Sequence, residues 1–379
     1  MISDSPHVTV AEIRSYDEDL YGRLRTAMFD SDLRKLIDTA PSRVLVKPNL
    51  IHASLPDAAQ TTHPTLVESV VRILQEAGHE VILADSFSGA RLWNERGLRT
   101  VYRKTGMEAV AKRTGCSLNW DTGWTIHTIP TGKVIKQVEM MNVVETVDWI
   151  VNVPKLKTHV YTGFTVSIKN MFGLVPGHFK VSYHARFADV QTFACALCDI
   201  ALSLPVRFSV VDAVMAMEGN GPTGGTPRHV GAIFMGDDMF AVDSVAARFC
   251  GFEPRTIHWL PSVSVTVNGP APESIIPRGL LRPDTRRKGM GVFSNHVIRT
   301  MSQRILRNVF APVPSPDSSH CIRCGMCVNA CPTSAVEPAR KDAFPVIRKD
   351  LCIRCYCCHE ACQHNAMVIT PSRFARLFV

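Results

Sequence analysis

Nine of the thirteen cysteines lie in one short C-terminal segment, at spacings that suit iron–sulfur chemistry. Eight of them form two copies of the pattern C-x2-C-x2-C-x3-C, which begin at Cys321 and at Cys352. Two intervening residues let a tight loop direct three sulfurs at one iron–sulfur cube, and the fourth cysteine begins a helix that points to the other cube. This crossed assignment predicts two 4Fe-4S clusters. The first would be held by Cys321, Cys324, Cys327 and Cys362, and the second by Cys331, Cys352, Cys355 and Cys358.

The second copy departs from the first at two positions. It contains an additional thiol, Cys357, and it continues with Gln363 where the first copy continues with a proline. A spare, packed thiol is the simpler interpretation of Cys357, and an exchange of ligands or a redox role is the alternative. Zinc knuckles are the alternative for the whole segment, but zinc sites usually place two C-x2-C pairs on either side of a longer loop. Residues 317–371 resemble the bacterial-type two-cluster ferredoxin module, which implies a short path for electrons rather than a catalytic site.

The composition excludes a fibrous or mainly disordered chain. Of the 379 residues, 46% are hydrophobic and 20% are charged, which is typical of a globular protein with two or three domains. No apolar run approaches the roughly 18 residues needed to cross a bilayer, and the N-terminus lacks the basic start and apolar core of a signal peptide. We therefore expect a cytoplasmic protein, in which cysteines bind metal more often than they form disulfides.

A sharp change in cysteine content marks a domain boundary. Between Ala311 and Asp317 every second residue is a proline, which predicts an extended spacer. The expected units are an α/β domain at 1–277, a basic and proline-rich connector at 278–316, the cluster module at 317–371 and a tail at 372–379.

Short β-branched runs alternate with helical patterns along the first of these units. Strands are predicted at Arg43–Lys47, Glu80–Asp85, Trp149–Val153, Phe208–Asp212 and Val230–Met235, and helices at Thr65–Gly78, His184–Leu204 and Ala241–Cys250. This alternation predicts an α/β fold with a mostly parallel sheet covered by helices, joined to a small α+β ferredoxin-like module. Residues 117–148 are richer in strand-forming residues and are interpreted as an insertion.

Polar side chains follow the predicted strands, at the edge where open α/β sheets bind ligands. Lysines are frequent among them, and burying several like charges is costly unless an anion neutralises them. We therefore predict a site for a phosphate- or carboxylate-bearing ligand at this edge. The candidate catalytic residues are Lys155, Lys157, His159 and Lys169, and the candidate binding residues are Lys47, Asn49, Asn170, Asp212, Asn220, Gly221 and Gly224.

Simpler interpretations remain open for several of these residues. Lys155 and Lys157 are also typical of a solvated turn, and Asp212 and Asp243 of helix caps or lysine partners. A single histidine such as His159 is more often structural than catalytic. The glycine-rich run 219–225 matches neither the P-loop nor the dinucleotide fingerprint. Cys195 and Cys198, three residues apart in an apolar helix, are interpreted as packing residues.

Five runs of sequence resemble one known family. They are VLVKPNL, VNVPKLKTH, SIKNMFGLVPG, MEGNGPTGG and FAVDSVAARFCGF, and they resemble the DUF362 family, a domain of unknown function often fused to ferredoxin modules. The resemblance covers roughly residues 40–255. It implies the architecture described above, and it implies no settled reaction or substrate.

Residues 278–310 carry eight Lys or Arg residues and a single acid, Asp284, and so account for most of the net charge of +8. Apolar residues recur there at roughly helical spacing, as in a basic amphipathic helix. A helix packed on its own domain is favoured. Peripheral contact with an anionic membrane and contact with an acidic redox partner are alternatives. No aromatic–basic pattern supports nucleic-acid binding.

These features predict an iron–sulfur oxidoreductase that passes electrons through the two clusters to an anionic substrate or cofactor. A separate redox protein would donate or accept the electrons. The alternative is a non-catalytic electron carrier whose α/β domain serves docking or sensing, so the sequence does not decide whether the protein is an enzyme. No flavin motif is recognised, although a flavin site of another kind stays open.

Overall fold

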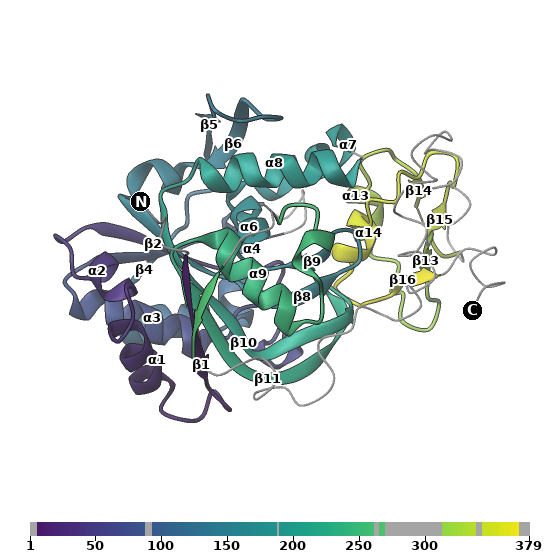
Figure 1. Cartoon of the computed structure of the whole chain (residues 1–379). Coiled ribbons are helices and arrows are strands. Elements are labelled where there is room, and N and C mark those ends of the chain that lie inside the picture. Colours follow the sequence, from purple (N-terminus) through teal and green to yellow (C-terminus); the bar gives the residue numbers. More distant parts are fainter. Residues whose placement is uncertain are drawn as a thin grey trace.

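A sheet of ten strands runs through the large domain of the computed structural model (Figure 1). The structure describes residues 6–87, 93–187, 189–260, 265–269, 313–338 and 343–370. The main order of strands is β12-β1-β11-β10-β7-β2-β3-β4, and β8 pairs with both β10 and β9. The strands are β1 (His7–Glu12), β2 (Arg43–Pro48), β3 (Glu80–Leu83), β4 (Ser117–Leu118), β7 (Trp149–Val153), β8 (Lys155–His159), β9 (Gly163–Thr165), β10 (Val206–Asn220), β11 (Gly224–Gly236) and β12 (Thr266–Asn268).

The centre of this sheet is parallel, as predicted. β2 pairs in parallel with β3 and β7, and β10 pairs in parallel with β7 and then with β8. The apolar runs of β2 and β7 are buried, which is the pattern of parallel strands covered on both faces. The β10–β11 hairpin and β1 add antiparallel pairs on one side.

Helices cover both faces of the sheet and divide the interior into two cores. Leu66 and Val70 of α3 join one core, and Phe193 and Leu197 of α8 join the other. The α-helices of the large domain are α1 (Leu20–Phe29), α2 (Leu33–Ile37), α3 (Pro64–Glu76), α4 (Glu95–Lys104), α5 (Met107–Thr114), α6 (Ser167–Met171), α7 (Gly177–Arg186), α8 (Val190–Leu202) and α9 (Met239–Phe249). Short 3-10 helices are η1 (Pro56–Ala58), η3 (Asn142–Thr146), η4 (Phe172–Leu174) and η5 (Pro254–Thr256). The predicted α/β class is confirmed.

The structure corrects the single helix predicted for His184–Leu204. That stretch contains the end of α7 and the whole of α8. The Asp189 side chain accepts a hydrogen bond from the backbone N–H of Thr192, so it caps the start of a new helix. The apolar periodicity continued across this break and concealed it. In the strand-rich stretch 117–148, β4 joins the main sheet, whereas β5 (Trp124–Thr128) and β6 (Gln137–Met141) form a separate hairpin.

The cysteine-rich module contains two small antiparallel sheets and two short helices. Its elements are β13 (Val313–Pro316), α13 (Met326–Asn329), β14 (Val336–Glu337), β15 (Val346–Ile347), α14 (Cys357–Glu360) and β16 (Met367–Thr370). β13 pairs with β16, and β14 pairs with β15. The prolines of the predicted spacer that fall in β13 therefore lie in the sheet of the module. Figure 1 shows α14, in yellow, against the large domain near β8 and β9.

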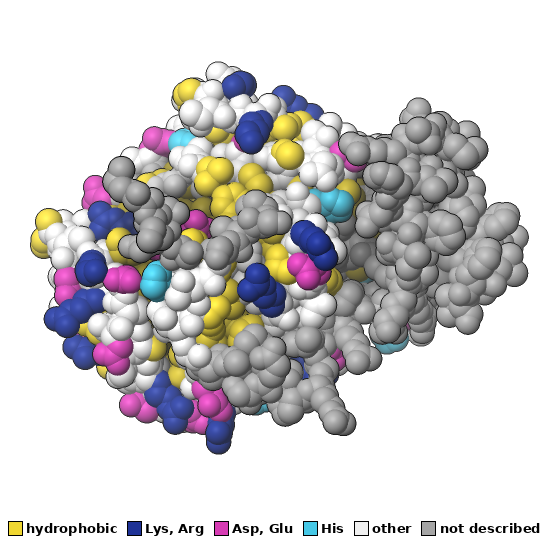
Figure 2. Space-filling model, viewed as in Figure 1, with side chains coloured by type: hydrophobic (Ala, Val, Ile, Leu, Met, Phe, Trp, Pro, Cys, Tyr) yellow, Lys and Arg dark blue, Asp and Glu magenta, His cyan; other side chains and the backbone are white. Residues whose placement is uncertain are grey.

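Charged residues of both signs share the surface around α1 and α2 (Figure 2). Arg34 pairs with Asp38 and Lys35 pairs with Asp32, and all four side chains are exposed. Exposed pairs of this kind contribute little to stability. In the described part of the chain, no helix is both long enough and apolar enough to cross a membrane. The basic segment 278–310 and the tail 372–379 lie outside the described residues.

Candidate functional site

The cysteine-rich module contacts the large domain at the carboxyl edge of the sheet. Nε2 of His159, at the end of β8, lies 3.1 Å from Oε1 of Glu360 on α14. Nε2 of His359 lies 3.0 Å from the backbone oxygen of Asn220 at the tip of β10. The hydroxyl of Thr223 donates to the backbone oxygen of His359 at 3.4 Å. The cysteine-bearing helix α14 therefore lies directly over the strand ends.

Two positions of the β10–β11 turn require glycine because atoms of neighbouring residues lie too close for a Cβ. A Cβ on Gly221 would lie 2.1 Å from the backbone oxygen of Thr158, and a Cβ on Gly224 would lie 2.7 Å from Cε1 of His359. Only glycine allows the turn to pack against β8 and allows α14 to approach. Gly221, Gly224 and Asn220 thus contact protein at this edge, and Pro222 of the same turn lines the neighbouring pocket.

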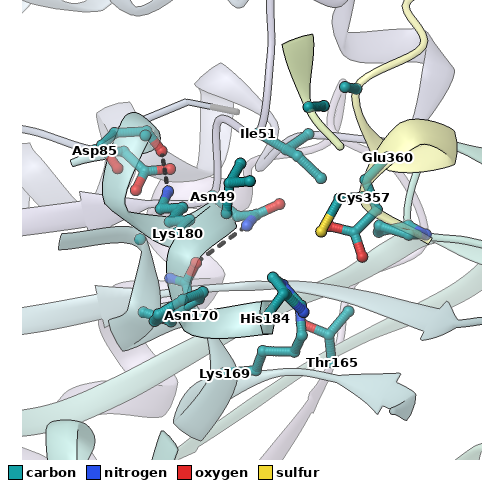
Figure 3. A pocket seen from close by; sticks show the side chains of 18 of the residues that line it. Asn49, Ile51, Asp85, Thr165, Lys169, Asn170, Lys180, His184, Cys357 and Glu360 are labelled. Carbon is teal, nitrogen blue, oxygen red and sulfur yellow. Dashed lines mark hydrogen bonds between the residues drawn. The ribbon is translucent and has the colours of Figure 1, made fainter. Parts of the chain in front are cut away.

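The pocket lies between α14 and the large domain, with a volume of about 80 Å³ (Figure 3). That volume holds a few water molecules, a phosphate group or a carboxylate. Its described walls come from the β2 and β3 ends, from β8 and β9, from α6 and α7, and from the module. The lining residues include Asn49, Asp85, Lys157, Lys169, Asn170, Lys180, His184, Pro222, Cys357 and Glu360.

Three lysines of this pocket lack a paired carboxylate among the described residues. Lys157 donates from Nζ to Oδ1 of Asn49 and to the backbone oxygen of Gln60, each at 2.7 Å. Lys180 donates to the backbone oxygen of Ser86 at 2.8 Å. Lys169 has no hydrogen bond or ion pair within the described ranges. The pocket therefore carries more positive charge than its own residues neutralise.

Burial and mutual repulsion make this excess of charge costly. Burial lowers the pKa of Lys157 well below its usual value, and the nearby Lys169 and Lys155 lower it further. Burial lowers the pKa of Lys180 to about 7. The pKa of Lys169 is also lowered by burial, against the opposing effect of Glu360. A bound anion would reverse these shifts, which is the chemical reason to expect one here.

The carboxylate of Asp85 is neutralised by a different lysine. Asp85 lies 2.7 Å from Nζ of Lys47, and both side chains are buried. Lys47 also donates to Oδ1 of Asn170 at 3.0 Å, and Asn49 donates to the same oxygen at 3.1 Å. A Cβ on Gly173 would lie within 2.4 Å of both charged groups. Lys47 therefore orients the Asn49 and Asn170 amides of the pocket instead of facing a ligand itself.

The remaining acidic partner, Glu360, faces a neutral histidine. Nδ1 of His159 accepts a hydrogen bond from the backbone N–H of Tyr161 at 3.1 Å, so the proton of the neutral ring lies on Nε2, which faces Oε1 of Glu360 at 3.1 Å. Burial, together with the charge of Lys169, lowers the pKa of His159 to about 3. The Glu360 carboxylate thus stays charged at the pocket wall and offsets one lysine at most.

Lys155 and Asp212 are among the predicted site residues that do not line this pocket. Nζ of Lys155 lies 3.0 Å from Oδ2 of Asp212 and donates to the Tyr16 hydroxyl at 3.0 Å; the Lys155 and Asp212 side chains are fully buried, and Tyr16 is partly buried. Asp243 accepts the backbone N–H groups of Ser167 and Ile168 at the start of α6, and burial raises its pKa to about 7. The side chains of Lys155, Asp212 and Asp243 therefore all have hydrogen-bond or ion-pair partners within the protein. Asp212 and Asp243 correspond to the simpler interpretations, a lysine partner and a helix cap.

Sequence reasoning missed the residues that α7 and α14 bring to the pocket. Lys180 and His184 lie on α7, whose start after Pro176 was a usable signal for a new helix. His184 is 4% exposed, and its Nδ1 has no hydrogen-bond partner in the described part of the chain. Cys357 and Glu360 reach the pocket only because the module docks there, and no local pattern predicts that contact.

The donor set of the module fits iron–sulfur clusters. Burial raises the pKa of Cys327 to about 11, and the nearby Cys362, Cys324 and Cys321 add to this shift. Cys352 and Cys358 are affected in the same way by Cys331 and Cys355. Cys362 thus lies near Cys327, and Cys331 lies near Cys352 and Cys358, although Cys327 also lies near Cys358. The crossed assignment of the ligands stays a prediction.

Two backbone groups point at sulfurs of this donor set. The N–H of Ala335 donates to Sγ of Cys331 at 3.1 Å, and the N–H of Ala366 donates to Sγ of Cys362 at 3.2 Å. Hydrogen bonds to the ligand sulfurs are one of the means by which proteins set cluster potentials. Within the described residues, no three His, Cys, Asp or Glu side chains are grouped to hold a single metal ion. The ligands of a cluster bind different iron atoms and stand farther apart.

Comparisons with known proteins match one family model to the large domain and another to the first cysteine copy. The family model described as a domain of unknown function, DUF362, matches residues 44–248, and the 4Fe-4S binding domain matches residues 314–337. A thylakoid-associated protein of Synechocystis is 31% identical over 219 residues, which are 57% of this chain and 65% of that protein. The chain therefore spans less than two thirds of this relative's length. Lactate racemase apoprotein from Thermoanaerobacterium thermosaccharolyticum aligns with a TM-score of 0.43 and 13% identity, over 65% of this chain and 57% of that one.

Proposed function

The chain belongs to the DUF362 family and carries a 4Fe-4S binding domain for electron transfer, and from this premise we propose that it is an iron–sulfur oxidoreductase. In this proposal, electrons pass through two 4Fe-4S clusters to a small anionic substrate or cofactor in the pocket beneath α14. The observation that carries the proposal is the position of three unpaired lysines directly beside the cysteine-bearing helix.

The two copies of the cysteine pattern support two clusters. Arg323 and Arg354, at equivalent positions, have left-handed φ values of 60° and 56°. Gly325 and Tyr356, also equivalent, have φ values of 76° and 63°. A non-glycine residue rarely adopts this conformation, so its recurrence indicates that both loops wrap an object of the same shape. When bound, each cluster supplies one-electron transfer.

The pocket is suited to a ligand that gains negative charge. Lys157, Lys169 and Lys180 would neutralise the charge that develops on the ligand as it is reduced. The Asn49 and Asn170 amides would orient it. His184, with its unpartnered Nδ1, is positioned to donate or accept a proton there.

Anaerobic purification tests this proposal directly. Iron and sulfide analysis is expected to give two 4Fe-4S clusters per chain, and mass spectrometry is expected to find a small carboxylate or phosphate compound bound to the holoprotein. Isothermal titration calorimetry of the holoprotein with inorganic phosphate is expected to show one site. A colourless protein without iron, or a holoprotein that binds no anion, would contradict the proposal. The second result would favour an electron carrier whose α/β domain serves docking.

A further inference from the structure

The charged groups around the pocket do not balance. In the described part of the chain, three lysines and two carboxylates line it: Lys157, Lys169, Lys180, Asp85 and Glu360. The Asp85 carboxylate is already paired with Nζ of Lys47 at 2.7 Å. His184 adds no charge near neutral pH, because burial lowers its pKa to about 4. When the three lysines are protonated, Glu360 alone opposes them, and two positive charges remain for an occupant to neutralise.

The same lysines have more N–H donors than acceptors. Each lysine ammonium carries three donors. Lys157 uses two of them, on Oδ1 of Asn49 and on a backbone oxygen, and Lys180 uses one, on another backbone oxygen. Lys169 uses none within the described ranges, so three of the nine donors are used and six remain. The three terminal oxygens of a phosphate ester offer about six lone-pair sites, whereas a carboxylate offers about four.

These donors reach the pocket from three elements of the large domain. Lys157 belongs to β8, Lys169 to α6 and Lys180 to α7. Lys169 and Lys180 lie on different sides of the space that Figure 3 shows. Donors placed around a centre suit a tetrahedral group, whose oxygens point in several directions, better than a planar carboxylate. The volume of about 80 Å³ is enough to enclose one phosphate group.

The first turn of α7 adds a partial positive charge to this wall. The helix begins at Gly177, which lines the pocket, and the N-cap residue Pro176 forms no side-chain cap hydrogen bond. The positive end of a helix dipole favours phosphate groups. A second observation on the same helix is independent of the dipole. His184 lines the pocket and is 4% exposed, and its Nδ1 has no hydrogen-bond partner among the described residues, which indicates a polar occupant.

We propose that the pocket binds its ligand through a doubly charged tetrahedral phosphate group, so that the substrate or cofactor is a phosphate ester and not a carboxylate. The inference rests on the proposed function and names the substrate class of the same site. A phosphate monoester carries a charge of about −1.5 to −2 at pH 7, which matches the two surplus positive charges. A carboxylate carries one charge and would leave a buried lysine uncompensated.

The test is isothermal titration calorimetry of the anaerobic holoprotein at pH 7 with four small anions at equal ionic strength. Methyl phosphate and methanesulfonate share a tetrahedral shape and differ in charge. Sulfate is a tetrahedral dianion without an ester group, and acetate is a planar monoanion. We expect methyl phosphate and sulfate to bind about tenfold more tightly than methanesulfonate and acetate, since each additional charge meets an uncompensated lysine.

A charge-removing variant tests the cause of this preference. Lys169→Gln leaves one surplus charge in place of two, so its preference for methyl phosphate over methanesulfonate should be several-fold smaller than in the unmodified protein. Lys104→Gln, on the exposed surface of α4, is the matched control and should keep the full preference.

The outcomes separate this inference from the proposed function. If acetate or methanesulfonate binds as tightly as methyl phosphate, the phosphate class is wrong while the anion site stands. If Lys169→Gln keeps the full preference, the surplus charge does not select the ligand and the inference is wrong as well. If none of the four anions binds the unmodified holoprotein, the anion site itself is wrong and the inference falls with it.

Discussion

Glu360 and His159 join the cysteine-rich module to the sheet, with 3.1 Å between Oε1 of the glutamate and Nε2 of the histidine. The histidine ends β8 and the glutamate ends α14, so two residues 201 positions apart in sequence form one wall beside the pocket. The pair is nearly inaccessible to solvent, with side-chain exposures of 0% and 11%. This contact positions the ligand-bearing helix over the lysines.

Removing the carboxylate should loosen the docking of the module. Glu360→Ala removes the carboxylate that faces the buried Nε2 of His159 at 3.1 Å, and a buried polar group left without a polar neighbour typically costs about 1–3 kcal/mol. Amide hydrogen exchange along α14 should therefore become faster in the holoprotein. Glu337→Ala is the matched control, because Glu337 forms an exposed pair with Arg348 in the same module and such pairs contribute about 0–1 kcal/mol. Equal exchange rates in the two variants would show that the contact does not hold the module.

Of the three pocket lysines without a paired carboxylate, Lys169 should contribute most to the affinity for an anion. Lys169→Gln removes a charge that forms no ion pair among the described residues, and hydrogen bonds to charged groups contribute about 1.5–3 kcal/mol. Calorimetry with inorganic phosphate should therefore show affinity reduced roughly 10- to 100-fold. Lys104→Gln, on the exposed surface of α4, should leave the affinity unchanged. If Lys169→Gln binds phosphate as tightly as the unmodified protein, Lys169 does not contact the ligand.

Anion binding should weaken as the pH rises through neutrality. Burial lowers the pKa of Lys180 to about 7, so this lysine is charged below that pH and neutral above it. A group with a depressed pKa loses its attraction for an anion as the pH increases, and the bound anion shifts the transition upward. Sulfate is the suitable probe because its own charge is constant in this range.

The expected sulfate affinity is several-fold higher at pH 6 than at pH 8.5, with a flatter profile for Lys180→Met. Calorimetry in buffers of equal ionic strength measures both profiles, which controls for screening. A profile that rises with pH, or that keeps its shape in the Lys180→Met variant, would exclude Lys180 as the titrating group.

The sheet was predictable because each of its strands corresponds to a local run of apolar residues in the sequence. The β-branched run of β7 was predicted with its observed bounds, Trp149–Val153, since burial on both faces requires a continuous apolar segment. Lys157 and Lys169 were placed at the correct edge because residues after parallel strands gather there. Lys155 belongs to the same edge, but its side chain turns to Asp212, a partner that only the folded sheet brings near.

The other half of the pocket depends on contacts without a local signal. Cys357 and Glu360 belong to a module whose docking is set by His359, by the absence of a Cβ at Gly224 and by the pair with His159. Each of these contacts joins residues more than a hundred positions apart. Sequence patterns report helix and strand periods, and they do not report which surfaces of two domains meet.

The crossed assignment of the ligands can be tested by substituting Cys331, which belongs to the first copy of the pattern but is assigned to the cluster of the second copy. Cys331 lies in the first copy, yet its thiol is near Cys352 and Cys358 of the second. Cys331→Ala should therefore disturb the cluster of the second copy and leave the set of Cys321, Cys324 and Cys327 complete with Cys362. Iron per chain should fall to about half, and the reduced protein should show the resonance of one isolated cluster instead of two interacting ones. Cys250→Ala, a buried thiol in the large domain, should keep the full iron content. If Cys331→Ala abolishes the same cluster as Cys324→Ala, and not the one abolished by Cys355→Ala, the ligands are not exchanged between the copies and each loop must hold its own.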